Sequence, residues 1–284
     1  MIAKLIYFVL LLALALAIPF VCAAQSSNQS SSEKENEPDF IVPSRPTVSN
    51  PAEFQRPGVL QLEMGFNSNF RAPGDASQAD LPLALRFAAS GRILLELDLD
   101  SPLSQKAMGV RTTGSGDAQL GIQAVIQHEK ETRPGIAIAY YVKLPSASET
   151  KGLGSGRIDH NFIGFISKKF GGTTVDFNAI YLLAGRTTDS GHASSGQFAL
   201  AASRNVTARW GIQGEISGFS RNDAQPAAMF ALSAVTYQVN RRLVLDGGAR
   251  AGLTSEAPRI GFFAGMTVGV ANLYRHHRHS SSFH

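Results

Sequence analysis

The sequence has a single cysteine, few charged residues and no long apolar run beyond its first segment. One cysteine among 284 residues excludes a disulfide framework and a cysteine-based metal centre. Charged residues make up 17% of the chain, and after residue 24 no apolar run is long enough to cross a membrane as a helix. The net charge of +4 comes without an aromatic-interleaved basic patch or an RNA-binding motif, so we expect no nucleic-acid partner. Abundant glycine and scarce helix-favouring runs suit a β-rich protein.

The first 24 residues have the organisation of a secretory signal peptide. Lys4 provides the positive charge, residues 5–21 form the apolar region, and Ala24 ends a stretch of small residues suited to signal peptidase. We expect cleavage near Ala24. An uncleaved helical anchor is the less favoured alternative, because the run is short and Pro19 interrupts it. A lipoprotein acylated at Cys22 is disfavoured by the large residues that precede this cysteine.

The two ends of the chain that remain after the expected cleavage contain few apolar residues. Residues 25–57 are rich in Ser, Asn, Glu and Pro, and we expect a flexible periplasmic leader whose last part tucks against or into a barrel mouth. Residues 275–284 are expected to be a solvated tail. Histidines gather in that tail without a carboxylate or a cysteine beside them, so we predict no metal site: His276, His277, His279 and His284. The glycine-rich stretch GLGSG lacks a Walker lysine, and no cofactor is predicted.

Between residues 58 and 274 apolar residues recur with a period of two. In the first of these stretches Leu60, Leu62, Met64 and Phe66 alternate with polar or small residues, which sends one set of side chains to each face of a sheet. The same pattern predicts twelve strands, with the faces ambiguous in the sixth and tenth. They lie near 58–70, 79–89, 92–100, 117–128, 134–144, 157–169, 173–185, 195–204, 208–220, 227–239, 242–253 and 260–273.

The connections between these strands alternate in length. Those after the even strands are short, such as ASGR and KKFGG, whereas most after the odd strands are longer and rich in Gly, Ser and Asp. Outer-membrane barrels combine an even strand number with short periplasmic turns and long external loops. In hydrocarbon every backbone amide must be paired, so the strands must close into a ring. We therefore predict an all-β fold, a twelve-stranded antiparallel transmembrane β-barrel in the outer membrane. A secreted β-sandwich or lipocalin-like barrel is the alternative.

Basic side chains gather in the short turns. They face anionic phospholipid headgroups in one interpretation, and in the other they are simply solvated turn residues: Lys130, Arg133, Lys168, Lys169, Arg204, Arg209, Arg241 and Arg242.

Charged residues occupy the strand face opposite the apolar one. If the apolar face meets lipid, these side chains line the lumen, with acids outnumbering bases: Glu63, Arg86, Glu96, Asp98, Lys143, Asp176, Glu215, Asp246 and Arg250. We expect Arg86 to pair with Glu63 or Glu96 on flanking strands, and Asp246 with Arg250 along one strand. The set forms either a hydrated, mildly cation-favouring passage or a salt-bridged plug of side chains. Twelve strands lie between small filled barrels and open porins, so size alone does not decide.

One pair of residues allows a catalytic alternative. In the stretch GHASSG, His192 and Ser194 are two residues apart and share one face of any strand there. This spacing is similar to the His-x-Ser arrangement of outer-membrane phospholipases, but Ser195 stands where that family has Asn. A serine nucleophile also needs a group that orients its base. A Gly/Ser-rich external loop is the favoured interpretation.

An ordered series of segments resembles a known family. QRPGVLQLEMGF, GDAQLGIQAVI, YYVKLPSAS, GSGRIDHNFIGFISKKF, VDFNAIYLLAG and SGQFALAASR together are similar to the transporter-like barrels of the "Putative MetA-pathway of phenol degradation" family, over about residues 44–274. The resemblance implies an outer-membrane barrel that passes small, aromatic or hydrophobic compounds. It supplies no catalytic residues.

These observations lead to one main hypothesis and two alternatives. The main hypothesis is a channel or transporter-like barrel for small molecules, and not an enzyme. The alternatives are an acyl hydrolase that uses His192 and Ser194, and a structural barrel with a closed lumen. The expected partners are outer-membrane lipids, small solutes and the machinery that assembles outer-membrane barrels.

Overall fold

The computed structural model describes residues 40–72, 76–107, 109–187, 189–222 and 226–274. Most of these described residues are in strands, and one short 3-10 helix lies at Glu149–Lys151. The strands are β1 (Val59–Ala72), β2 (Ala76–Ala88), β3 (Ile93–Ala107), β4 (Val110–Gly114), β5 (Ala118–Gln127), β6 (Gly135–Leu144), β7 (Asp159–Phe170), β8 (Thr173–Gly185), β9 (His192–Asn205), β10 (Trp210–Phe219), β11 (Ala228–Asn240), β12 (Leu243–Gly252) and β13 (Ile260–Asn272). The predicted signal peptide, the first part of the predicted leader and the histidine tail lie outside the described residues.

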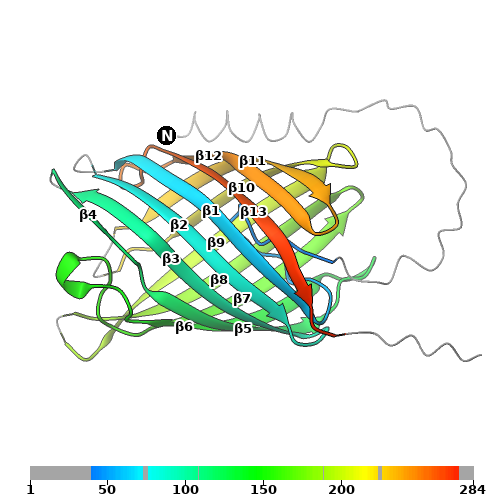
Figure 1. Ribbon diagram of the computed structural model, residues 1–284, viewed down its shortest axis with the longest axis horizontal. Coiled ribbons are helices and arrows are strands. Elements are labelled where there is room, and N and C mark those ends of the chain that lie inside the picture. The colour runs from blue at the N-terminus through cyan, green and yellow to red at the C-terminus, as the bar shows by residue number, and fades with distance from the viewer. Residues whose placement is uncertain (1–39, 73–75, 108, 188, 223–225, 275–284) are drawn as a thin grey trace, which may run out of the picture.

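The strands form one closed antiparallel ring (Figure 1). Each strand pairs with its neighbours in the chain, and β1 pairs with β13 to close the circle. The short β4 pairs only with the protruding end of β3, while β5 pairs with the first half of β3. Twelve strands therefore make up the wall, which confirms the predicted barrel, and no strand edge of the wall is left without partners.

The third predicted strand was placed too short. It ends at residue 100 in the prediction, whereas β3 continues to Ala107 and forms a hairpin with β4 in a stretch that was assigned to a loop. Pairing between Leu103–Ala107 and Val110–Gly114 satisfies the backbone there, and the sequence VRTTG, with a valine and two threonines, suits a strand.

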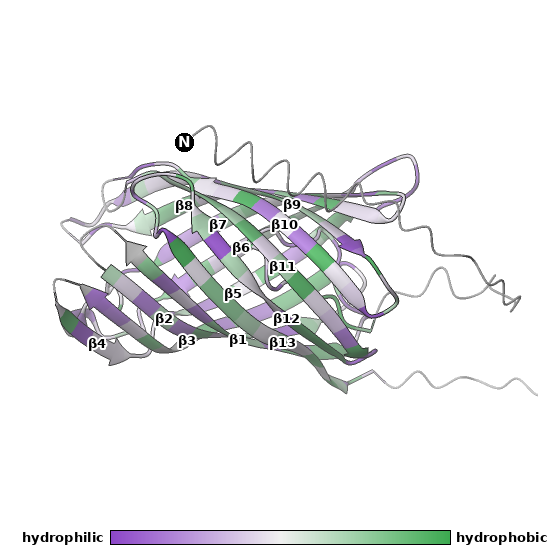
Figure 2. Ribbon diagram, turned by 90° about the horizontal axis from the view of Figure 1, so that it is seen from above, coloured by the Kyte–Doolittle hydropathy of each residue, from purple (hydrophilic) through white to green (hydrophobic). Residues whose placement is uncertain are grey.

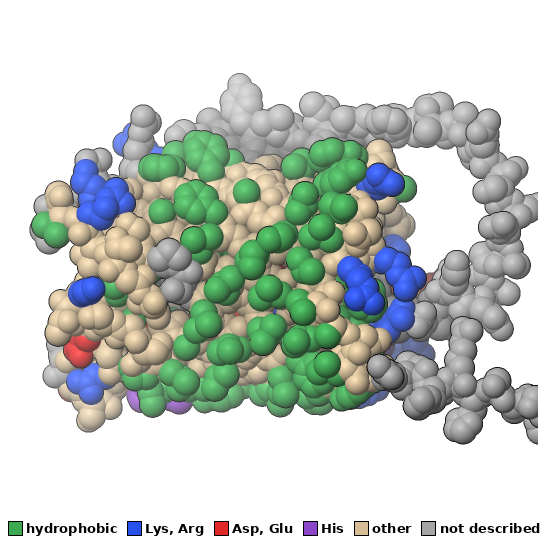
Figure 3. All heavy atoms as spheres, viewed as in Figure 1, with side chains coloured by type: hydrophobic (Ala, Val, Ile, Leu, Met, Phe, Trp, Pro, Cys, Tyr) green, Lys and Arg blue, Asp and Glu red, His purple; other side chains and the backbone are tan. Residues whose placement is uncertain are grey.

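The outer face of the ring is apolar and the inner face is polar. Leu85, Leu95 and Ile138 are 38%, 45% and 54% exposed, whereas Arg86 and Glu96, their neighbours on β2 and β3, are buried. Hydropathy alternates along the strands in Figure 2, and Figure 3 shows apolar side chains over the face formed by β1, β2, β3 and β13, with Lys and Arg at its two ends. A water-soluble sandwich would place the apolar set at its centre, so that alternative is wrong.

The two ends of the barrel differ for most connections as predicted, but the long loop predicted between the first two strands, at 71–78, is wrong, because β1 continues to Ala72 and β2 begins at Ala76. Residues 89–92, 128–134, 171–172, 206–209 and 241–242 make the short turns, and 145–158, 186–191, 220–227 and 253–259 connect strands at the other end. Trp210 and Tyr237 contact each other at the short-turn end, with ring centroids 4.7 Å apart, as expected where an aromatic girdle meets a membrane interface. In the part of the chain that the structure describes, no helix is long and apolar enough to cross a membrane.

Candidate functional site in the barrel lumen

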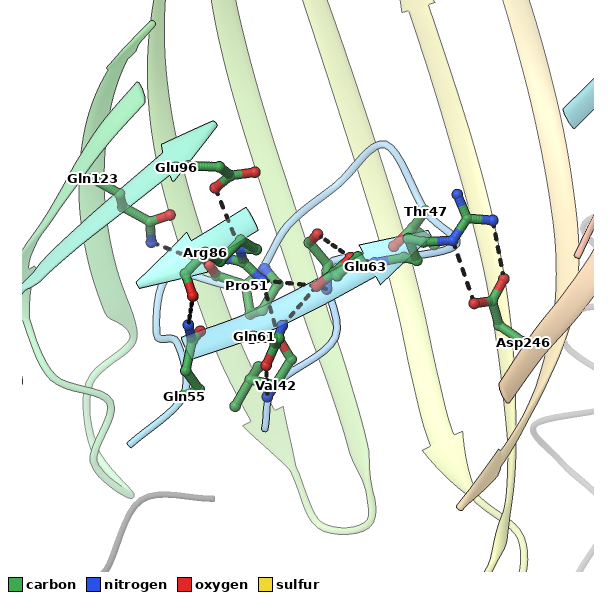
Figure 4. A network of polar contacts seen from close by, with 12 residues as sticks. Val42, Thr47, Pro51, Gln55, Gln61, Glu63, Arg86, Glu96, Gln123 and Asp246 are labelled. Atoms are coloured by element: carbon green, nitrogen blue, oxygen red, sulfur yellow. Dashed lines mark hydrogen bonds and ion pairs between the residues drawn. The ribbon is translucent and has the colours of Figure 1, made fainter. Parts of the chain in front are cut away.

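Residues 40–57, here called the lumen segment, lie inside the ring (Figure 4). Phe40 and Ile41 pack against Val59 near the short turns, and Ala52 packs on the inner wall against Phe165. The sequence assigned this stretch to a flexible leader with an end tucked into the barrel mouth. Residues 40–57 do lie inside the ring, but they are held at many points rather than flexible, because the inner strand faces offer partners for a backbone that lacks its own.

Glu63 on β1 holds the first part of the lumen segment. Its carboxylate accepts hydrogen bonds from the backbone N–H of Ser44 (2.9 Å) and Arg45 (3.1 Å) and from the Ser44 hydroxyl (2.7 Å). Gln61, two residues away on the same face, exchanges bonds with both the N–H and the C=O of Val42. A buried carboxylate is costly without partners, and here the segment supplies them.

The opposite wall holds the middle of the segment. Arg45 forms an ion pair with Asp246 on β12 (3.3 Å), and the N–H of Ser49 donates to Glu215 on β10 (2.7 Å). The predicted pair between Asp246 and Arg250 is therefore wrong. Four residues along a strand span about 13 Å, so Arg250 lies far from Asp246, and the arginine of the segment takes its place.

The last part of the segment is bound by amides and a hydroxyl. Asn50 and Asn178 on β8 exchange two hydrogen bonds, of 2.7 and 2.8 Å. The N–H of Ala52 donates to the Ser167 hydroxyl (2.7 Å), which in turn donates to Asp176 (2.5 Å). Contacts from β1, β7, β8, β10 and β12 show that the segment crosses the lumen rather than lining one wall.

The segment leaves the lumen beside a short turn. Glu53 lies 3.0 Å from His128 Nδ1 and accepts a hydrogen bond from the N–H of Glu129 (2.9 Å). The Lys168 ammonium donates to the Glu129 carboxylate, and this bond lowers the pKa of Glu129 below its usual value. The turn after β5 is thereby joined both to the segment and to β7.

Arg86 joins the segment to three strands. It lies 3.2 Å from Glu63 and 3.2 Å from Glu96, and it donates to the carbonyl of Val42 (3.1 Å). Tyr141 donates to the same Glu96 (3.1 Å). The predicted pairing of Arg86 with carboxylates on flanking strands is confirmed, and Arg86 bonds to both of them rather than to one.

The half of the lumen near the long loops contains the remaining predicted residues. Asp98 accepts a bond from Gln119 (3.3 Å), and Lys143 lies between Asp159 (2.7 Å) and Asp117 (3.1 Å). On the neighbouring strands Asp80 accepts a bond from Asn67 (2.8 Å), and Arg250 donates to Asn69 (2.9 Å). None of these bonds involves the lumen segment.

Two cavities lie on the inner side of the wall. One of about 300 Å³ adjoins Asp98, Asp117 and Lys143 in the half near the long loops. The other, of about 330 Å³, lies between Phe40 of the segment and strands β9–β12 near the short turns. The two cavities therefore lie toward opposite ends of the barrel, and Phe40 and Ile41 of the lumen segment line the one near the short turns.

His192 and Ser194 lie in β9, not in a loop, and both are exposed on the outer face. Among the described residues no hydrogen bond joins them, and the ring nearest to His192 is that of His160, with centroids 5.7 Å apart. A serine nucleophile without a bonded base and an orienting group has no proton relay.

The residues that sequence reasoning missed are the amides and hydroxyls that bind the segment. Gln61 shares the inner face with Glu63, so its place could have been found from parity. Nothing local marks Asn178 or Ser167 as partners of Asn50 and Ala52, which are more than 100 positions away in the chain.

Comparisons with known proteins agree with this geometry. The model of the family described as "Putative MetA-pathway of phenol degradation" matches residues 44–269, which include most of the lumen segment. An outer membrane channel from Pseudomonas putida F1 superposes with a TM-score of 0.62 at 13% identity, covering 76% of this chain and 97% of that one. The NanC porin superposes with a TM-score of 0.51 at 6% identity, covering 74% and 98%. No curated protein matches in sequence. The predicted fold, an outer-membrane β-barrel, is confirmed.

Proposed function

We propose that this protein is an outer-membrane channel for small solutes. The chain belongs to the "Putative MetA-pathway of phenol degradation" family, and the proposal starts from that membership. The observation that carries the proposal is the two-sided wall, whose apolar outer face surrounds an inner face of carboxylates, amides and basic residues. Charges on membrane strands are stable where they face water or one another, so this inner face suits a hydrated passage. Like other such barrels, the protein would reach the membrane through the outer-membrane assembly machinery.

The chemistry of the open half of the lumen supports small solutes that carry a hydroxyl or a positive charge. Four carboxylates, Asp80, Asp98, Asp117 and Asp159, stand there against two basic residues, Lys143 and Arg250. The surplus of acids favours cations over anions. Carboxylate and amide oxygens also accept hydrogen bonds from hydroxyl groups, and the family description names phenol degradation. Small aromatic compounds with a hydroxyl group are thus the solutes we propose.

We expect passage to involve a shift of the lumen segment. The segment bonds to strands around the ring, and the two cavities lie on either side of it. A barrel whose segment never moves would be the structural, closed-lumen alternative.

Reconstitution into planar bilayers tests the proposal. We expect the purified protein to give single-channel conductance with a preference for cations, and liposomes that contain it to swell in small phenolic solutes. Tight liposomes and silent bilayers, with correctly folded protein, would reject the channel. We propose no catalytic role, because no described contact gives Ser194 a base.

A further inference from the structure

The outer wall over β5, β6 and β7 has a hollow. A row of mostly small residues, Ala124, Ile138 and Gly164, runs across three paired strands directly below a row of bulky ones. A Cβ atom on Gly164 would meet nothing within 4 Å. The resulting cavity of about 480 Å³ is open to the apolar surroundings of the barrel, and its upper edge is formed by Tyr140 and Phe162.

A ladder of rings leads from this hollow to the long-loop end of the barrel. The Phe162 and Tyr140 centroids are 5.3 Å apart, Tyr140 stacks on His160 at 6.0 Å, and His160 lies 5.7 Å from His192. The Tyr140 hydroxyl and His160 Nδ1 are 2.7 Å apart. The ladder therefore changes from apolar to hydrogen-bonding groups toward the long-loop end of the barrel.

The first carbons of the Arg157 side chain lie close to the strand position that pairs with His192. His192 pairs with Gly185, and a Cβ atom on Gly185 would lie 2.6 Å from the Cβ of Arg157, so the Arg157 side chain begins in the space that this glycine leaves. Arg157 is exposed, and no described carboxylate forms an ion pair with it. The two imidazoles and the stem of the Arg157 side chain thus lie close together on the wall, between the apolar hollow and the long loops, and the guanidinium has the length of its own side chain to reach a ligand held there.

We propose that this wall binds a phosphorylated glycolipid of the outer leaflet. One acyl chain lies in the hollow over Ala124 and Gly164, and a phosphate of the head group meets Arg157, His160 and His192. Guanidinium and imidazole N–H groups are strong donors to phosphate oxygens, and hydrocarbon is the medium that fills an apolar hollow at this depth. A protein partner is the weaker match, because the hollow lies within the band that faces hydrocarbon. The proposal requires the outer-membrane location but not channel activity.

Native mass spectrometry of the folded protein in detergent tests it, with lipid A carrying both phosphates as the probe and the same glycolipid without phosphates as the comparison. We expect the wild type to retain lipid A and to bind the dephosphorylated form much more weakly. The triple variant Arg157→Gln, His160→Gln, His192→Gln should weaken lipid A binding by about tenfold or more, since three donors to phosphate are lost. Gly164→Leu fills the hollow and should weaken the binding of both lipids.

Two matched variants serve as controls. Arg259→Gln removes another exposed arginine near the long loops, and Ala264→Leu enlarges an exposed residue on β13, across the ring from the hollow. Both should bind lipid A like the wild type. Equal binding of the two glycolipids by the wild type would overturn the proposal, and so would wild-type binding by either the triple variant or Gly164→Leu. Unchanged gel mobility of the unheated protein shows that each variant is folded.

Discussion

The two halves of the lumen use their charged residues differently. Near the short turns Glu63, Glu215 and Asp246 each bond to the lumen segment. Near the long loops Asp98 and Lys143 bond only to side chains of neighbouring strands and loops. The same pattern of inward charges thus binds the lumen segment at one end of the barrel and faces the lumen at the other.

This difference shows that an inward carboxylate in a barrel is not by itself evidence of a passage. In the half of the lumen near the short turns, the carboxylates replace water as acceptors for the N–H groups of the lumen segment. Their presence is explained by binding of the chain to itself. Only the residues beyond the segment are free to act on a solute. Three experiments test this difference between the two halves.

The largest effect is expected from fixing the segment in place. An ideal Cβ on Gly135 would lie 3.5 Å from the Cβ of Ala52, within the range of a disulfide. The double variant Ala52→Cys, Gly135→Cys should lose single-channel conductance when oxidised and regain it with a reductant, because the segment can no longer shift. The native Cys22 lies in the expected signal peptide and does not interfere.

The single variant Gly135→Cys is the control and should conduct like the wild type under both conditions. If the oxidised double variant also conducts normally, solutes pass beside a stationary segment. The half of the lumen near the short turns would then contact solutes, as the half near the long loops is proposed to do.

The second largest effect is expected in stability. Arg86→Met should lower the free energy of unfolding by about 3–5 kcal/mol, because it leaves Glu63 and Glu96 buried without their cation. Denaturant unfolding followed by the fluorescence of Trp210, the single tryptophan, measures it. Arg250→Met, nearer the long loops, should cost only about 1–2 kcal/mol, since it loses one hydrogen bond to Asn69, a contact with Phe230 and the longer-range attraction of Asp80 and Glu215, but no ion pair among the described residues. Equal losses would show that the two halves do not differ.

The smallest effect is expected in ion selectivity. Replacing two lumen carboxylates near the long loops, Asp80→Asn and Asp98→Asn, should lower the preference for cations by about twofold and leave the free energy of unfolding nearly unchanged. Reversal potentials in a salt gradient measure this preference. Glu215→Gln in the inner half is the comparison: it should weaken the hold on Ser49 without changing selectivity through the outer half. A larger change in cation selectivity in Glu215→Gln than in the Asp80→Asn, Asp98→Asn variant would contradict the assignment of ion selectivity to the half near the long loops.

Much of the barrel wall could be predicted because it follows from patterns among residues that are close in the sequence. The alternation at Leu60, Leu62 and Met64 sets which face meets lipid, and the short connections set the ends of the strands. The pairing of Arg86 with its flanking carboxylates followed from the register of three consecutive strands. The β3–β4 hairpin was missed because its strands extend past the apolar band, where no alternation of apolar residues marks them.

The barrel, its two faces and most of its connections follow from local sequence, since period two and loop length act between residues that are close in the chain. The role of the inward charges depends on contacts that form only in the folded ring. Residues 40–57 are polar and rich in proline, and nothing in that composition separates a free leader from a buried one. The ring brings Asp246 to Arg45 across 201 positions, and Asn178 to Asn50 across 128. A closed wall gives those groups partners that no short stretch of sequence reveals.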